Sequence, residues 1–274
     1  MLITFALTKI IKIIIVNIKN VFKHYFSEPA IWLYLFIALI LGWYTFSQGY
    51  AQQYWYLFII LIIVAPFYEW VAHKYLLHDL IGNVYTIDKQ EDVKVGDKIF
   101  VDILNKQQEV EIMSINDNEM EVGYGKAKNS KFYRDYMDRL HIGHHADPNN
   151  IKLIFAPISV ALILFTKFFL LVLLLTFNIG MALTFTFATV LYYLHYEWMH
   201  LGHHIPGYEH IFPWSKKLKK AHLFHHYRNE NYWWGITNIF GDIVLGTYPN
   251  YKEIKVSKTV MNINQKPKVT KHKK

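Results

Sequence analysis

Residues 179–204 read IGMALTFTFATVLYYLHYEWMHLGHH, a long apolar run that ends in histidines. The apolar part, Ile179 to Trp198, carries one charged residue, Glu197. A helix rises roughly 1.5 Å per residue, so a run of this length can cross a hydrocarbon layer of about 30 Å. The stretch therefore predicts a transmembrane helix that brings histidines to one face of the membrane.

Three further runs have the same character, and they cover Ala30–Ser47, Tyr54–Val71 and Leu153–Thr176. A chain of 274 residues leaves too little protein to bury four apolar helices in a soluble core. The connections at 48–53 and 177–178 are uncharged, whereas lysines and arginines gather on the opposite side. By the positive-inside rule, both termini and the long middle loop are expected on the cytoplasmic face.

The composition excludes several kinds of chemistry. The chain has no cysteine, which rules out disulfides, cysteine-bound metals and thiol nucleophiles. Its net charge of +8 indicates an anionic partner, and in a membrane chain without a soluble binding module we favour anionic lipid over nucleic acid. Fifteen histidines are the unusual feature, and they direct attention to metal chemistry.

One segment breaks the helical pattern. Ile99–Ile103 and Glu109–Ile112 alternate apolar and polar residues between turn residues, and the segment is acidic and lacks histidine. We expect a small insertion of three or four β-strands on the cytoplasmic side, which supplies no metal ligands. The predicted organisation is an interfacial amphipathic helix at 1–26, a first transmembrane hairpin with the first histidine motif at 27–83, the β-rich insertion at 84–128, the second histidine motif with the second hairpin and a catalytic cap at 129–251, and a basic, disordered tail at 252–274.

Eleven histidines fall in four short motifs on the predicted cytoplasmic face: His73 and His78; His141, His144 and His145; His200, His203 and His204; and His222, His225 and His226. Positions i, i+3 and i+4 share a helix face, so each HxxHH motif is expected to present three imidazoles toward one point. His73 and His78 lie about 140° apart on a helix, so they reach two different metals or straddle a helix end.

Neutral imidazole suits iron, zinc, copper and nickel. Eight to ten such ligands exceed what one ion accepts, so the motifs imply two metals. A metal-scavenging tract is the alternative, but a tract is contiguous, whereas these motifs are separated and return twice to the ends of membrane segments.

The motif series HxxxxH, HxxHH, HxxxH and HxxHH on a four-helix membrane scaffold resembles the fatty acid hydroxylase and sterol desaturase superfamily. The likeness extends to Asp147-Pro148 after the second motif and to Gly246–Pro249, and it covers Phe67–Pro249 apart from the β insertion. The resemblance implies an all-α membrane protein with a cytoplasmic di-metal cap. It implies ten metal ligands: His73, His78, His141, His144, His145, His200, His204, His222, His225 and His226. His203 fits this pattern less well.

The resemblance implies an O2-dependent di-iron hydroxylase that inserts one oxygen atom into a fatty acyl chain or similar long-chain lipid, with zinc able to replace iron in isolated protein. These residues carry no flavin, nicotinamide or haem fingerprint, so a separate electron-transfer protein is expected to supply the electrons. A lipid or sterol desaturase and a carotenoid hydroxylase are enzymatic alternatives with the same site. A membrane metal-binding protein without catalysis is the alternative from another class.

Three carboxylates are candidates to accept a hydrogen bond from the N–H of a ligand imidazole. Glu69 lies four residues before His73, Glu197 lies three before His200, and Asp147 follows the second motif. For the two glutamates, solvation at the membrane interface is an equally weighted alternative. His195 either takes a similar supporting role or simply faces the helical bundle.

Overall fold

The computed structural model describes residues 18–79, 84–103, 106–124, 136, 138–209, 213–257 and 260. The chain folds into two compact units, each assembled from separate segments. We call them the helical unit (Met1–Trp70, Ile154–Leu223, Trp233–Tyr248) and the sheet-bearing unit (Val71–Leu153, Phe224–Tyr232, Pro249–Lys274). The predicted segment limits follow chain order and remain predictions. Residues 1–17 of the expected interfacial helix and most of the tail after 257 lie outside the described residues.

Four helical stretches in the described residues are long and apolar enough to cross a membrane, as predicted: Pro29–Ser47, Tyr56–His78, Ile151–Thr176 and Ile179–His204. They contain the helices α2 (Pro29–Ser47), α4 (Tyr56–Val71), α7 (Ile151–Ile154), α8 (Ile158–Thr176) and α9 (Ile179–His204). The short helix α3 (Tyr50–Gln53) lies in the first uncharged connection. The structure therefore agrees with the expected mainly helical membrane fold.

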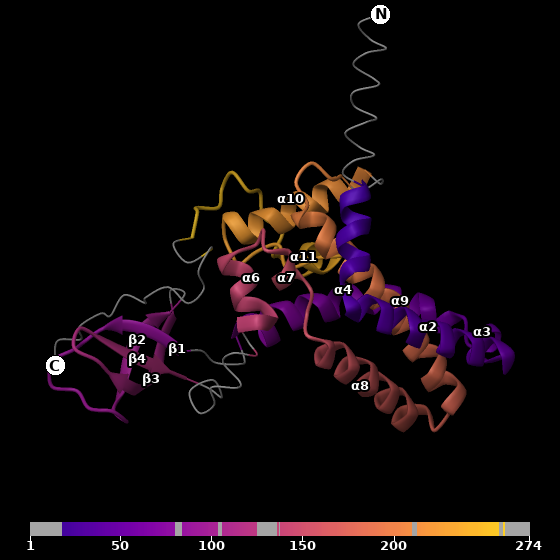
Figure 1. The fold of residues 1–274 in the computed structure, drawn as a ribbon, viewed down its shortest axis with the longest axis horizontal. Coiled ribbons are helices and arrows are strands. Elements are labelled where there is room, and N and C mark those ends of the chain that lie inside the picture. The colour runs from indigo at the N-terminus through magenta and orange to yellow at the C-terminus, as the bar shows by residue number, and fades with distance from the viewer. Residues whose placement is uncertain are drawn as a thin grey trace, which may run out of the picture. The chain divides into compact units, whose positions relative to one another are not determined.

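Within the helical unit, α9 is the central helix, and both α2 and α8 pack along it (Figure 1). The Asn178 side chain starts α9 by accepting a hydrogen bond from the Met181 N–H at 3.0 Å. Gly42 of α2 lets Phe187 approach closely, because a Cβ there would lie 3.0 Å from the phenyl ring. These contacts fix the helix whose C-terminal end carries the third histidine motif.

The sheet-bearing unit contains a four-stranded antiparallel sheet in the order β1-β4-β3-β2. The strands are β1 (Val84–Asp88), β2 (Lys98–Ile103), β3 (Lys106–Ile115) and β4 (Glu119–Gly123). The apolar residues of the alternating pattern form the sheet's buried core: Ile87, Val101, Val110, Ile112, Met120 and Val122. The predicted small sheet is therefore present, and no histidine belongs to these strands.

The other three histidine motifs lie on shorter elements than α9. In the sheet-bearing unit they are the π-helical turns η1 (Ala72–Asp79) and η3 (Asp138–Ile142), followed by α6 (Gly143–Ala146). Helix α10 (Pro213–Tyr227) carries the fourth motif, and α11 (Phe240–Val244) follows the loop after it.

Candidate metal centre

Five histidines of the sheet-bearing unit converge on one point. One ring nitrogen from each lies within 4.8 Å of the others, a spacing that can hold a metal ion; the five are His73, His78, His141, His145 and His225. Four of them are buried and His78 is half-buried. The His141 Nε2 atom lies 3.2 Å from the His73 Nε2 and 2.8 Å from the His78 Nε2. Three separate motifs therefore meet in one nitrogen-rich cluster.

The backbone of η1 determines how the two histidines of the first motif lie relative to each other. A π-helix closes hydrogen bonds from i to i+5, so residues five apart lie nearly above one another. His73 and His78 are five apart on this turn, and their ring centroids are 5.3 Å apart. Both therefore belong to the same cluster of ring nitrogens.

The second histidine motif, at 141–145, was predicted to present three imidazoles to one point, and the structure does not show this arrangement. His141 and His145 belong to the cluster, whereas His144 packs against His226 of the same unit, with ring centroids 4.6 Å apart. The reason is helical geometry. Viewed down the helix axis, the side chain at i+3 lies to one side of residue i, and the side chain at i+4 lies to the other side. An HxxHH motif thus divides its side chains between two directions.

Backbone carbonyls orient two of these imidazoles. The His225 Nδ1 donates to the Tyr232 carbonyl at 2.8 Å, and the His145 Nδ1 donates to the Val260 carbonyl at 3.3 Å. Each bond fixes the tautomer in which Nε2 is the nitrogen that can coordinate a metal. Motif spacing gives no sign of these partners, because Val260 is 115 residues from His145.

The electrostatics of the cluster suit a cation. Burial lowers the pKa of His141 well below its ordinary value, and the neighbouring His145, His78, His73 and His144 lower it further. The imidazole is therefore neutral, which is the form that binds metals. A cluster of imidazole nitrogen donors fits iron, zinc or copper, and it fits calcium or magnesium poorly.

The helical unit brings together three more predicted ligands: His200 and His204 on α9, and His222 on α10. The His204 and His222 Nε2 atoms are 2.9 Å apart, and the His200 ring lies 5.0 Å from that of His222. His203 points elsewhere, because its Nε2 donates to the Ile236 carbonyl at 2.8 Å. This agrees with its weaker fit to the motif.

Two buried carboxylates hold the loop that receives His203. Asp242 accepts hydrogen bonds from the Trp234 and Gly235 N–H groups at 2.9 and 2.8 Å. Burial raises the pKa of Asp242, and the hydrogen bonds from Thr247, Gly235 and Trp234 act in the opposite direction.

Glu69 binds the next two residues of the same loop, Ile236 and Thr237. It accepts from the Ile236 and Thr237 N–H groups at 3.3 and 3.1 Å, and from the Thr237 hydroxyl at 2.7 Å. Tyr192 donates to it as well, at 3.0 Å. Neither alternative predicted for Glu69 describes this arrangement, since its partners are a loop and a tyrosine, 123 to 168 residues away. Local spacing could not reveal such partners.

The other two carboxylate candidates lie in contrasting places. Glu197 is 1% exposed on α9. Asp147 is exposed; its backbone N–H donates to the Gly143 carbonyl, and its own carbonyl accepts from the Asn150 N–H. Supporting roles for Glu197 and Asp147 remain predictions.

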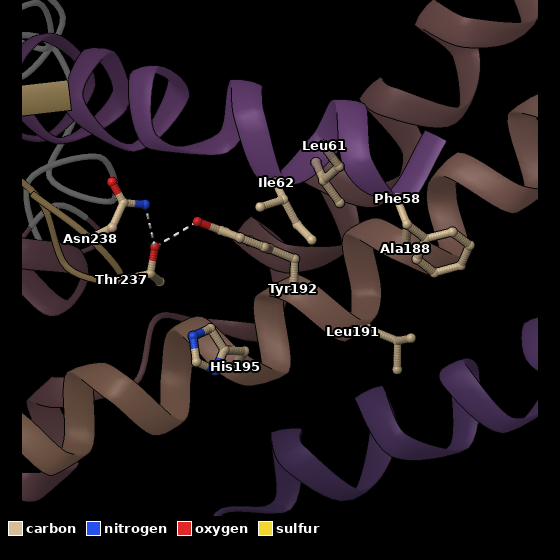
Figure 2. Close-up of a pocket in the computed structure, with 9 residues that line it drawn as sticks. All are labelled: Phe58, Leu61, Ile62, Ala188, Leu191, Tyr192, His195, Thr237 and Asn238. Atoms are coloured by element: carbon tan, nitrogen blue, oxygen red, sulfur yellow. Dashed lines mark hydrogen bonds between the residues drawn. The ribbon is translucent and has the colours of Figure 1, made fainter. Parts of the chain in front are cut away.

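A cavity of about 450 Å³ lies within the helical unit between α4, α9 and the loop (Figure 2). Its apolar residues gather at one end and its polar residues at the other, where Tyr192 and Asn238 meet at Thr237. The lining residues are Phe58, Leu61, Ile62, Ala188, Leu191, Tyr192, His195, Thr237 and Asn238. His195 therefore lines this cavity. This position is close to the second alternative, in which His195 faces the helical bundle.

The structure combines four helices that are long and apolar enough to cross a membrane with a cluster of histidine nitrogens that could hold a metal ion. Residues 130–247 match the sequence profile of the fatty acid hydroxylase family, a family of hydroxylating oxidoreductases, and this confirms the resemblance drawn from the histidine motifs. His73 and His78 lie before the matched segment.

Two curated relatives from Arabidopsis thaliana are similar to this chain. They are the dihydroceramide fatty acyl 2-hydroxylases FAH2, 34% identical over 116 residues, and FAH1, 33% identical over 122 residues. Each match covers 41% of this chain and 46% of the relative, so the chain spans about half the length of the relatives it matches. A solved structure of full-length Scs7p, with only its hydroxylase domain visible, has the same fold: the TM-score is 0.58 at 20% identity, over 84% of this chain and 68% of that one.

Proposed function

We propose that the protein is an O2-dependent di-iron lipid hydroxylase that inserts one oxygen atom into a long fatty acyl chain. The observation that carries this proposal is the cluster of five histidine nitrogens within 4.8 Å of one another, in a chain that matches the fatty acid hydroxylase family over residues 130–247. When bound, two iron ions and O2 would supply an oxidant for an unactivated C–H bond, which acid–base side chains cannot cleave. The second oxygen atom leaves as water, which requires two electrons from a separate donor protein and two protons.

The ligand count supports two ions. Five histidines converge in the sheet-bearing unit, and one ion cannot accept all ten predicted ligands. We propose that the second ion binds to the three ligands of the helical unit, His200, His204 and His222. His144 and His226 remain predicted ligands. Iron is the proposed working metal, and zinc would also bind such nitrogen ligands in isolated protein.

The cavity of the helical unit is the proposed lipid site. Its volume lies in the usual range for ligand pockets, and its apolar end fits a hydrocarbon chain. The polar end lies at Thr237 and Asn238, on the loop whose Ile236 carbonyl accepts a hydrogen bond from His203 at the end of α9 (Figure 2). An acyl chain would then place the carbons nearest its polar group closest to the metals. Because the Arabidopsis relatives are named for 2-hydroxylation of the dihydroceramide acyl group, an acyl group of that kind is the proposed substrate.

The proposed topology follows from the charge distribution. Both termini and the metal site lie on the cytoplasmic face, where a soluble electron donor can reach them. The β-rich insertion is a proposed docking module for that donor or for a regulator. The roles of Glu197 and Asp147 as partners of ligand imidazoles are proposed on sequence position alone.

Comparative lipidomics tests the proposal. Cells expressing the wild-type chain under 18O2 should accumulate lipids that are heavier by one labelled oxygen atom. His225→Ala should abolish this product, whereas His24→Ala, outside both histidine groups, should not. Products lighter by two hydrogens would instead identify a desaturase. If iron-loaded, chemically reduced protein consumes no oxygen and oxidises nothing in a full lipid extract, the hydroxylase proposal is wrong.

A further inference from the structure

Lys219 makes three contacts with the end of the helix that carries the third histidine motif. Its ammonium donates to the carbonyls of Gly202, Ile205 and Tyr208, at 3.0, 2.8 and 2.7 Å. Helix α9 ends at His204, so these carbonyls belong to its last turn and the chain that follows. An ammonium has three donors, and each finds an acceptor here. Its positive charge also lies at the negative end of the helix dipole.

Lys219 and the ligand His222 act on the same neighbour. They are three residues apart on α10 and so lie on one face of that helix. His222 places its Nε2 atom 2.9 Å from that of His204, while Lys219 bonds to carbonyls on either side of His204. One face of α10 therefore joins α9 at two points, and two points fix both separation and rotation.

The contact is specific to this lysine. Lys216 is largely exposed and pairs with Glu209, and Lys217 is exposed as well. The sequence presents 216–220 as one basic cluster for anionic lipid, but the structure directs Lys219 inward against protein carbonyls. Next to it, Leu218 is 1% exposed, so this turn of α10 is packed as well as hydrogen-bonded.

We propose that Lys219 is a positioning residue for the metal site, which ties α10 to the end of α9 so that His204 and His222 face the same ion before it binds. The proposal rests on the proposed two-metal function. Backbone carbonyls are its partners, so the residue acts on the ligands through the two helices. Partners outside the ligand set typically change metal affinity by about 10- to 100-fold when removed.

Hydrogen exchange on metal-free protein tests whether Lys219 stabilises the end of α9. The full chain is compared in detergent as wild type, Lys219→Met, Lys219→Arg and the matched control Lys217→Met. Amides of 200–208 should exchange faster in Lys219→Met alone, because arginine can still donate to the carbonyls. Unchanged exchange in Lys219→Met overturns the proposal whatever the metal content.

Zinc titration of the same proteins tests the consequence. Wild type, Lys217→Met and Lys219→Arg should bind two ions, whereas Lys219→Met should keep one tight site and lose affinity at the other by at least about 10-fold. Two equally tight sites in Lys219→Met overturn the positioning role. If wild type itself binds fewer than two ions, the proposed di-metal function fails, and the exchange experiment still decides whether Lys219 ties the helices.

Discussion

Glu69 offers the sharpest test of how the metal-bearing helices are supported. Its carboxylate is 8% exposed and accepts four hydrogen bonds: from the N–H groups of Ile236 and Thr237, from the Thr237 hydroxyl and from the Tyr192 hydroxyl. We consider the substitutions Glu69→Ala and Glu69→Gln, which remove the acceptors in different numbers.

The magnitude follows from what each variant leaves behind. In Glu69→Ala the two hydroxyls still bond to each other at 2.6 Å, but two backbone N–H groups lose their acceptor. A buried N–H without an acceptor costs about 1–3 kcal/mol, so the free energy of unfolding should fall by about 2–6 kcal/mol. Glutamine retains one acceptor oxygen for both N–H groups, and its amide can donate to the hydroxyls, so Glu69→Gln should lose less than half as much.

Thermal unfolding in detergent measures this difference. Trp233 and Trp234 lie on the supported loop and are 1% and 2% exposed, so their fluorescence reports on it. At roughly 2–4 °C per kcal/mol, Glu69→Ala should melt at least roughly 4 °C below wild type. Asp147→Ala, an exposed carboxylate, should melt as wild type. The reasoning is refuted if Glu69→Ala also melts as wild type, or if the glutamine variant is as damaged as the alanine variant.

Three further predictions address other parts of the site. Gly235→Ala would place a Cβ 2.0 Å from the Asn238 backbone oxygen, a clash no side-chain rotation relieves, and at least about 1–3 kcal/mol of stability should be lost in the same melting assay. Zinc at 100 times its dissociation constant should stabilise the folded chain by about 2.7 kcal/mol. A melting temperature that changes with neither zinc nor a chelator would contradict the presence of a metal centre. Burial lowers the pKa of Lys219 to about 8, and Glu209 acts in the opposite direction. In the unfolded chain the pKa of this lysine has its ordinary value of 10.5. The folded state therefore binds fewer protons between those values, and the unfolding free energy of metal-free wild type, relative to Lys219→Met, should rise as the pH increases from about 8; a decrease over that range would contradict the assignment.

Local periodicity was enough to predict the elements of the fold. The four apolar runs needed only their length and charge, and the sheet needed only the alternation around Val101 and Val110, because both signals are read within one element. These features depend on neighbours in the chain.

The features that the sequence did not reveal depend on distant contacts or on an unusual backbone. An α-helical interpretation separates His73 from His78, and only the π-helical turn brings them together. Glu69 lies four residues before a histidine, yet its partner Thr237 is 168 residues away. Lys219 sits in a basic run and differs from its neighbours only because α9 ends beside it. A single sequence contains no signal for such pairings.

The supports found in the structure lead to a last prediction about the metal-free chain. In the helical unit, the ligands on α9 and α10 are held by hydrogen bonds from Lys219 and by the loop bound to Glu69, none of which requires a metal. In the sheet-bearing unit, η1 and η3 are π-helical turns, whose hydrogen-bond geometry is less favourable than that of an α-helix. Metal removal should therefore accelerate hydrogen exchange in 72–79 and 138–142 while sparing 200–208. Equal acceleration in both regions would mean that the metal, rather than the hydrogen bonds of Lys219 and Glu69, holds the helical ligands in place.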